Sequence, residues 1–299
     1  MAQFILHHYD TSPFSEKVRL LLGLKGLAWN SVIQPVIMPK PDLIPLTGGY
    51  RRIPVLQIGA DVYCDSQVIL AEIAGRAAGP PLEAAGWAMN LWADRLFFAV
   101  TVPVIFAEVQ VPAEFIADRE KLSGRPFNAA QMKAAAPYMA AQWRAEAAWL
   151  DEALATSPFL AGGAPGLADI AAYMNVWFLH GAARATAERL MTGFDHLEAW
   201  RQRMRAIGHG DRSEMTPAEA LEVARSSEPA VLLDHDPHDP QGLAPGVPVT
   251  VSADDYGRDP ITGTLVAANA RRIVIAREDP ALGRVNVHFP RVGYVVTPA

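Results

Sequence analysis

A hairpin that runs directly into a helix is the feature of this sequence that most restricts its fold. Residues 53–64 predict two short strands joined by a tight turn. Asp65 and Ser66 then supply the side-chain oxygens that cap helix N-termini, ahead of apolar residues at helical spacing. Residues 1–52 place a strand, a helix, a second strand and a loop rich in Pro and Gly before the hairpin. The order β-α-β-loop-β-β-α over residues 1–77 predicts a single α/β domain.

The rest of the chain predicts two further regions. Helical spacing of apolar residues continues from residue 86 to residue 225. Residues 229–299 instead carry short alternating runs separated by Gly, Asp and Pro, which favours a small β-barrel or sandwich. We therefore expect an α/β domain at 1–78, an all-helical domain at 86–226 and a separate small β domain at 229–299. The expected helices of the second domain are 86–110, 128–154, 167–181, 184–192, 194–207 and a short one ending at Arg225.

Composition and charge exclude several classes of protein. Of the 299 residues, 51% are apolar and 19% are charged, so the chain can build packed cores and need not be disordered. A net charge of −6 gives no basic surface to recruit nucleic acid. The first six residues lack the pattern of a signal peptide, and the apolar stretch 96–107 is too short to span a bilayer. We expect a cytoplasmic protein without a nucleic-acid or membrane partner.

The cysteine and histidine content argues against disulfide and metal chemistry. Cys64 is the only cysteine, so neither an intrachain disulfide nor a CxxC redox pair can form, which fits a reducing cytosol. Residues 235–239 read His-Asp-Pro-His-Asp and could be taken for a metal site. The Asp-Pro step is a turn signal, and no Cys/His cluster supports the site, so no metal is expected.

Three places in the α/β region could carry chemistry. Ser12 precedes Pro13 at a helix start, where free N–H groups and the helix dipole favour an anion and lower the pKa of a thiol. Pro54 opens an interior strand without a donor, and a cis bond after Ile53 would turn backbone polar groups toward a ligand. The Asp65–Ser66 pair suits a ligand that has both an ammonium and a carboxylate. The alternative for both serines is simple helix capping.

Taken together, these motifs resemble the thioredoxin-like N-terminal domain of glutathione S-transferases. The resemblance covers 9–20, 51–56 and 65–69, and the Ser-Pro-Phe start is similar to the serine-type classes, plant tau in particular. Residues 159–170 resemble a helix-start motif of the family's second domain, although Gly166 stands where Ser or Thr is usual. The tail, at 254–260 and 287–291, resembles a C-terminal extension of some bacterial transferase-like proteins.

The resemblance implies roles for individual residues. Ser12 would activate the glutathione sulfur, with Tyr9 as the rival, because other classes use an N-terminal tyrosine. The omega and beta classes carry a cysteine near the first helix, whereas this chain has Ser12 and Ser15 there, which disfavours glutaredoxin-like chemistry. The glutathione contacts implied are Ile53 with cis-Pro54 for the cysteinyl part, Ser66 for the γ-glutamyl carboxylate, Asp65 near its ammonium and Arg52 toward the glycyl carboxylate.

The resemblance also implies a reaction and an assembly. Glutathione would be the co-substrate of a transferase that attacks a small apolar electrophile, in a homodimer that serves detoxification. The alternative is a non-catalytic module with the same fold that binds glutathione or a protein partner. The electrophile would bind between the domains, although helix-spaced aromatic residues are more often plain core. The candidates for that apolar wall are Trp92, Phe97, Phe98 and Trp177.

Overall fold

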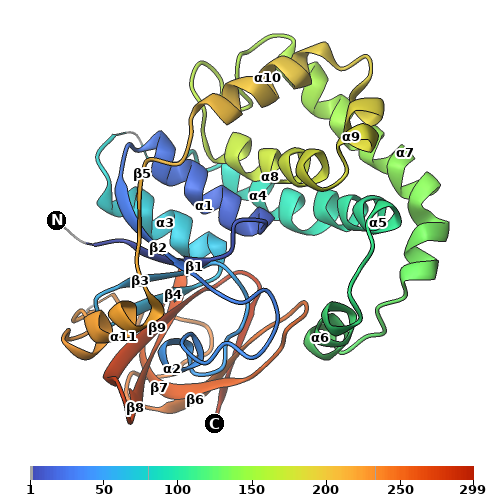
Figure 1. The fold of residues 1–299 in the computed structure, drawn as a ribbon. Coiled ribbons are helices and arrows are strands. Elements are labelled where there is room, and N and C mark those ends of the chain that lie inside the picture. The colour runs from blue at the N-terminus through green and yellow to red at the C-terminus, as the bar shows by residue number, and fades with distance from the viewer. Residues whose placement is uncertain (1–2, 80, 233) are drawn as a thin grey trace.

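The computed structural model of this chain describes residues 3–79, 81–232 and 234–299. It places a bundle of helices over one side of the α/β region, with the C-terminal strands on the other side (Figure 1). The α/β region has the predicted order of elements. These are β1 (Ile5–His8), α1 (Pro13–Leu24), β2 (Ala28–Ile33), α2 (Ile44–Thr47), β3 (Val55–Ile58), β4 (Asp61–Cys64) and α3 (Ser66–Arg76).

The α/β region has the pairing of a thioredoxin-like sheet. Strand β1 runs parallel to β2 and antiparallel to β3, and β3 forms the predicted hairpin with β4. Ser12 caps α1, because its Oγ accepts a hydrogen bond from the backbone N–H of Ser15 across 3.2 Å. The fold class predicted for this part of the chain is confirmed.

The second region is helical, as predicted, but its segments differ from the expected ones. The helix expected at 86–110 ends at Glu108 and contains a π-helical turn, and α6 is an additional helix that the periodicity did not predict. The elements are α4 (Gly86–Trp92), η1 (Ala93–Phe97), α5 (Phe98–Glu108), α6 (Ala113–Ser123), α7 (Ala129–Leu154), α8 (Leu167–Ala182), α9 (Arg184–Met191), α10 (Asp195–Ala206) and α11 (Pro217–Arg225).

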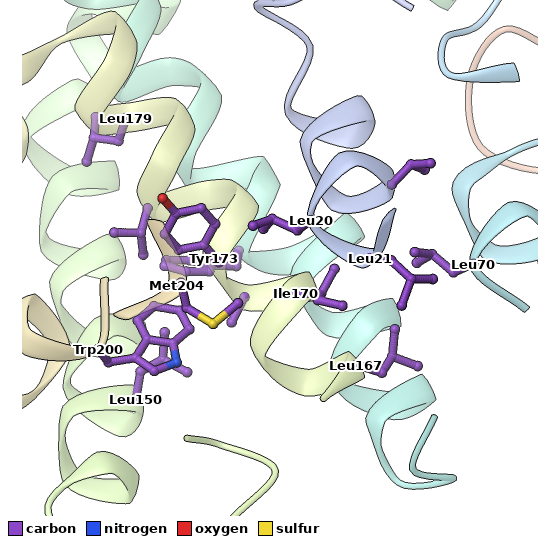
Figure 2. Close-up of a cluster of buried hydrophobic side chains, with 14 of the residues drawn as sticks. Leu20, Leu21, Leu70, Leu150, Leu167, Ile170, Tyr173, Leu179, Trp200 and Met204 are labelled. Carbon is purple, nitrogen blue, oxygen red and sulfur yellow. The ribbon is translucent and has the colours of Figure 1, made fainter. Parts of the chain in front are cut away.

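One apolar core joins the α/β region to the helices. In Figure 2, Leu20 and Leu21 of α1 lie against Ile170 and Tyr173 of α8. Trp200 of α10 extends the same cluster, and its ring lies edge-on to Tyr173 with centroids 5.8 Å apart. Because this core is continuous, the two regions hold a fixed arrangement, and a cleft between them has a defined shape.

Helix α8 is capped by a side chain from a neighbouring segment, because its N-cap residue, Gly166, has no side chain of its own. The carboxylate of Glu83 accepts hydrogen bonds from the N–H groups of Leu167 and Ala168, at 2.8 and 2.7 Å, and so caps α8. A Cβ atom at position 166 would lie only 2.4 Å from a Glu83 oxygen. The glycine therefore makes room for the carboxylate that replaces a capping Ser or Thr.

The C-terminal strands form as predicted but do not make a sheet of their own. They are β6 (Pro248–Ala253), β7 (Ile261–Ala268), β8 (Arg272–Asp279), β9 (Gly283–Pro290) and β10 (Tyr294–Pro298). Strand β9 pairs in parallel with β4, and β5 (Asp211–Glu214) pairs with β2 at the far edge, which gives one ten-stranded sheet of order β10-β6-β7-β8-β9-β4-β3-β1-β2-β5. The C-terminal strands therefore do not form the separate sheet that was expected. The edge of β4 that faces away from β3 would have unpaired backbone N–H and C=O groups, and β9 forms hydrogen bonds with them.

A second apolar core lies along this junction. Val62 and Cys64 of β4 are buried in the same cluster as Val287 and Phe289 of β9. The domain boundary predicted at residue 229 therefore crosses a shared core, and the division of the chain into domains at this residue stays a prediction.

By length and composition, the helical stretch Gly86–Glu108 is apolar enough to cross a membrane. It is longer than the apolar segment 96–107, which the sequence analysis judged too short to do so. A core helix of a soluble protein passes the same test. Here α5 packs against α7 and α4 against α8, so the stretch belongs to the helical bundle.

Candidate functional site

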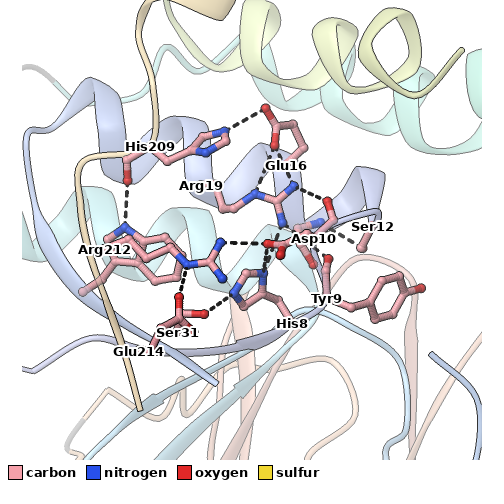
Figure 3. Close-up of polar contacts among 12 residues, drawn as sticks. His8, Tyr9, Asp10, Ser12, Glu16, Arg19, Ser31, His209, Arg212 and Glu214 are labelled. Atoms are coloured by element: carbon pink, nitrogen blue, oxygen red, sulfur yellow. Dashed lines mark hydrogen bonds and ion pairs between the residues drawn. The ribbon is translucent and has the colours of Figure 1, made fainter. Parts of the chain in front are cut away.

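A buried arginine fixes the loop between β1 and α1. The guanidinium of Arg19 donates to Glu16 Oε2 at 2.7 and 3.0 Å and to the carbonyl oxygen of Asp10 at 2.9 Å (Figure 3). The other oxygen of Glu16 lies 3.0 Å from His209 Nε2, in the segment that follows α10. An unpaired buried charge is costly, so this network holds the loop in one conformation. Tyr9 belongs to the loop and is therefore held in place.

Ser12 and Tyr9, the two candidates for thiol activation, line the same cleft. Ser12 is only 1% exposed and already caps α1, so its capping role is real and does not exclude a catalytic one. Burial raises the pKa of Tyr9, while the nearby Arg119 and Ser12 side chains act in the opposite direction. A tyrosine with a raised pKa stays protonated and can donate a hydrogen bond, so both residues remain candidates.

The five residues expected to contact glutathione come together in one pocket. Arg52, Ile53 and Pro54 line it from the loop before β3, and Asp65 and Ser66 line it from the start of α3. The Ile53–Pro54 bond is cis, as the resemblance implied. Asp65 has φ +91°, the one positive value among the non-glycine residues in the described part of the chain. Such backbone conformations gather at ligand sites, where the surrounding structure enforces them.

The other wall of this pocket comes from the C-terminal strands. The Tyr294 hydroxyl donates to Asp65 Oδ2 across 3.1 Å, and Arg52 donates to Asp255 Oδ1 at 3.1 Å and to the Tyr294 oxygen at 3.1 Å. Gln67 Nε2 donates to the carbonyl oxygen of Val292 at 3.4 Å. Polar groups that the resemblance assigns to glutathione are therefore paired with residues of the C-terminal region.

Three aromatic rings surround Arg52. Its guanidinium carbon lies 5.5, 5.1 and 5.8 Å from the ring centroids of Tyr50, Tyr256 and Tyr294. The cavity that remains in the pocket has a volume of about 70 Å³, which is room for a few water molecules, whereas ligand pockets measure roughly 300–1,000 Å³. The structure therefore shows this pocket in a closed arrangement.

A much larger cleft adjoins the pocket. Its volume is about 550 Å³, and it shares Phe14, Arg52, Ile53 and Tyr256 with the closed pocket. Helices α5, α6 and α7 supply most of its apolar wall. The wall includes Val102, Ile105, Phe106, Phe115, Phe127 and Met132.

Of the four aromatic residues proposed for the electrophile, only Phe98 lines this cleft. Trp92 and Phe97 stack on each other with centroids 5.0 Å apart and belong to the core between the helices. Trp177 packs on the same core, 5.7 Å from the Arg19 guanidinium. Helical spacing marks an apolar face but does not say whether that face meets a core or a cleft, so these three candidates are corrected to core residues.

Several lining residues were missed because no sequence signal links them to the motifs. Asp94 reaches the closed pocket from the π-helical turn η1, where it pairs with the buried Lys17 at 2.7 Å. π-Helical turns often mark functional sites, but their position is not visible in the residue pattern. Asp255, Tyr256 and Tyr294 reach the pocket only through the folding of the C-terminal region.

The residues weighed for metal or thiol chemistry have structural contacts. Across the described ranges, no group of three or more His, Cys, Asp or Glu side chains is placed to hold a metal ion. His235 Nδ1 accepts from the N–H of Ala268, and Asp239 pairs with Arg291. Cys64 is buried, and burial raises the pKa of its thiol, which makes it unreactive.

Comparison with known proteins identifies the family. The glutathione S-transferase N-terminal domain model matches residues 6–81, and the C-terminal domain model of the same family matches residues 115–203. A GST-like protein from Pseudomonas syringae is 35% identical, with 100% of each chain covered and a TM-score of 0.83. The chain belongs to the glutathione S-transferase superfamily. That comparison spans both full lengths, so it includes the C-terminal region of this chain.

More distant structures share the fold of the first two regions. A glutathione S-transferase domain-containing protein from Marinobacter aquaeolei is 22% identical over 68% of this chain and 97% of its own, with a TM-score of 0.52. The tau class glutathione S-transferase MiGSTU from mango is 18% identical over 68% of this chain and 89% of its own, with a TM-score of 0.53. No curated protein matches the sequence.

Proposed function

We propose that this protein binds glutathione in the pocket formed by Arg52, Ile53, Pro54, Asp65 and Ser66 and transfers it to an electrophile in the adjoining cleft. The observation that carries the proposal is the convergence of these five residues, from two separate segments, on one pocket that meets a cleft of about 550 Å³. The pocket contains a cation, Arg52, and a carboxylate, Asp65, which can pair with the carboxylate and ammonium groups of the tripeptide.

The chemistry follows from the position of Ser12. A glutathione sulfur at the start of α1 faces the positive end of the helix dipole, which favours the thiolate over the thiol. The Ser12 oxygen accepts from Ser15 N–H and its own proton can be donated to that thiolate. The thiol proton leaves to solvent, the sulfur forms a bond to the electrophilic carbon, and the leaving group departs with its electron pair. Tyr9 is the alternative donor.

The proposal requires the C-terminal region to move. Since about 70 Å³ is free and Tyr294 and Asp255 hold Asp65 and Arg52, glutathione can enter only when residues 254–256 and 292–294 swing away. The same closed pocket favours a second candidate function, a module that keeps the pocket shut and acts by binding a partner. The homodimer, the cytoplasmic location and the role in detoxification belong to the first proposal.

Calorimetry with glutathione, together with turnover of a generic aryl halide, tests the proposal. Ser66→Ala should weaken glutathione binding by about 1.5–3 kcal/mol, the usual value of a hydrogen bond to a charged group. Ser213→Ala, on the exposed strand β5, is the matched control and should bind as the wild type does. Absence of glutathione binding to the wild type contradicts the proposal and favours the module that keeps the pocket shut, whereas binding without turnover leaves a non-catalytic protein that binds glutathione.

A further inference from the structure

A loop of the C-terminal region forms part of the wall of the large cleft. The loop comprises residues 254–259, between β6 and β7, and its Tyr256 lines both the closed pocket and the cleft. The matches to the two family domain models end at residues 81 and 203, so neither includes this loop. Membership of the family therefore assigns no role to Tyr256.

Contacts on both sides of Tyr256 hold the loop in place. Before it, Asp255 pairs with Arg52 at 3.1 Å. After it, the N–H of Gly257 donates to the carbonyl oxygen of Leu122 in α6 at 2.8 Å. Gly257 has φ +61°, and a Cβ atom there would lie 2.8 Å from Leu122 Cδ1, so glycine lets the loop approach α6 this closely. Tyr256 is thereby held on the cleft wall.

The Tyr256 hydroxyl is available to a ligand. None of the described residues forms a hydrogen bond with it, and its oxygen is not among the fully buried polar atoms that lack a partner, so it is accessible from the cavity. Burial raises the pKa of Tyr256, and the Arg52 guanidinium opposes this increase. Asp255 and Tyr9 add to the increase, whereas Arg119 opposes it. A phenol with a raised pKa stays protonated at pH 7 and donates a hydrogen bond.

The cations on the cleft wall already have partners. Arg51 donates to one oxygen of Asp118 at 3.1 Å, and Arg119 donates to the other at 3.0 Å. Lys40 donates to a backbone carbonyl oxygen and lies near Asp118, and its nitrogen is 6.0 Å from the centroid of the Tyr9 ring. Because these charges are compensated within the chain, the wall does not require an anionic ligand.

We infer that the cleft takes a neutral and largely apolar ligand with one oxygen acceptor, such as a ketone, and that the Tyr256 hydroxyl donates the hydrogen bond that orients it. The hydrocarbon part of this ligand lies against the apolar wall, from Val102 and Ile105 of α5 to Phe115 of α6. The cleft measures about 550 Å³ with the loop in place, so the ligand binds without the loop movement that glutathione requires.

The inference deepens the proposed function, because it names the chemical feature by which the cleft recognises its electrophile. It rests on that function only in taking the ligand for the electrophile, since the contact with Tyr256 forms without glutathione. In the reaction, the loop that moves to admit glutathione must close again before Tyr256 orients the ligand. The competing use of the Tyr256 hydroxyl is a contact with glutathione itself.

The test compares two probes of the same shape, acetophenone and α-methylstyrene, which carry an oxygen and a methylene group on the same carbon. Their binding to the full chain is measured by calorimetry, without glutathione, for the wild type, Tyr256→Phe and Tyr138→Phe. Tyr138 is an exposed residue of α7 outside the cleft, so its variant is the matched control. We expect Tyr256→Phe to weaken acetophenone binding about five-fold, as one neutral hydrogen bond allows, and to leave α-methylstyrene unchanged. Tyr138→Phe should change neither affinity.

Several results would overturn the inference. A wild type that does not bind acetophenone, or a Tyr256→Phe variant that binds it as the wild type does, would show that the hydroxyl is not the donor. Equal losses for both probes would mean that the ring, and not the hydroxyl, makes the contact. A selective loss of acetophenone in Tyr9→Phe alone would assign the donor to Tyr9. A Tyr256→Phe variant that loses only glutathione affinity would assign the hydroxyl to glutathione.

Gly257→Ala takes the place of Tyr256→Phe if the latter does not fold. The added Cβ atom presses on Leu122 at an unfavourable φ, which displaces the loop and Tyr256 with it. The affinity for acetophenone relative to α-methylstyrene should fall, and an unchanged ratio would contradict the inference. Failure of glutathione binding alone leaves the measurements with both probes intact, so the two proposals fail separately.

Discussion

Tyr294 donates its hydroxyl to Asp65 Oδ2 across 3.1 Å, and this bond ties the last strand of the chain to the start of α3, 229 residues away. Asp255 pairs with Arg52 in the same pocket. Arg52 and Asp65, the two charged residues proposed to contact glutathione, are thus both paired with residues of the same chain. Opening the pocket must break these bonds, so their strength sets how readily an external ligand can compete.

Tyr294→Phe should increase the affinity for glutathione. The variant keeps the ring that packs on Arg52 and removes the hydroxyl that bonds both Asp65 and Arg52, and these bonds stabilise only the closed pocket. A bond to a charged group contributes about 1.5 kcal/mol, so the apparent affinity should rise about ten-fold. Calorimetry measures the change. Tyr138→Phe, at an exposed position of α7, is the matched control. An unchanged or weaker affinity of Tyr294→Phe would mean that the hydroxyl does not oppose glutathione.

The pKa of the bound glutathione thiol should distinguish Ser12 from Tyr9. Ser12→Ala removes the hydroxyl at the start of α1 and should raise the thiol pKa and lower turnover, while ground-state affinity changes little. Thiolate absorbance as a function of pH records the titration. If Tyr9→Phe shifts that titration and Ser12→Ala does not, the two roles are reversed.

The local parts of the site could be predicted from the sequence. A cap before a proline, a strand that opens with proline, and an Asp-Ser pair before a helix are each defined by neighbouring residues. The structure places all three where expected, with Ser12 at the N-terminus of α1 and a cis bond at Pro54. Local sequence specifies such features because the interacting groups lie within a few residues of one another.

The closure of the pocket could not be predicted in this way. The pairing of β9 with β4 depends on which sheet edge is free, and the approach of Tyr294 to Asp65 depends on that pairing. The aromatic residues of the helical region show the same limit, since Phe98 lines the cleft while Phe97, its neighbour, is fully buried. Periodicity defines faces of elements, and only tertiary packing decides what each face meets.

A chain cut after Ser227 should fail to fold as a soluble protein. The separate β domain predicted at 229–299 would let such a chain fold, but the truncation strips β9 from β4 and exposes Val62 and Cys64. Loss of each large buried side chain costs about 2–5 kcal/mol, and several together exceed the 5–15 kcal/mol that stabilises a domain. Soluble yield and thermal unfolding of the two chains measure this. A soluble truncated chain with a wild-type Tm would instead support the prediction that residues 229–299 form a separate β domain.

The buried pair Asp61–His288 should make stability fall in acid. Asp61 Oδ1 accepts from His288 Nε2 at 2.7 Å and its other oxygen accepts from Ala230 N–H at 2.8 Å, which joins β4, β9 and the segment between the regions. Burial alone would raise the pKa of Asp61, but these hydrogen bonds hold it below its ordinary value. A carboxyl whose pKa is lowered in the folded state stabilises fully above its unfolded pKa of about 3.9, and the contribution is lost as the pH falls through the lowered value.

Asp61→Asn should therefore lower Tm at pH 7 and flatten the decline of Tm below about pH 4, where the wild type loses this contribution. The neutral amide accepts a weaker hydrogen bond from His288 than a carboxylate does, and it does not change its own charge in acid. Asp211→Asn, on the exposed edge strand β5, is the matched control and should keep both the Tm and its acid slope. Thermal unfolding from pH 7 to pH 2 records both quantities. An Asp61→Asn variant whose Tm declines in acid as steeply as that of the wild type would show that other carboxyl groups control acid unfolding.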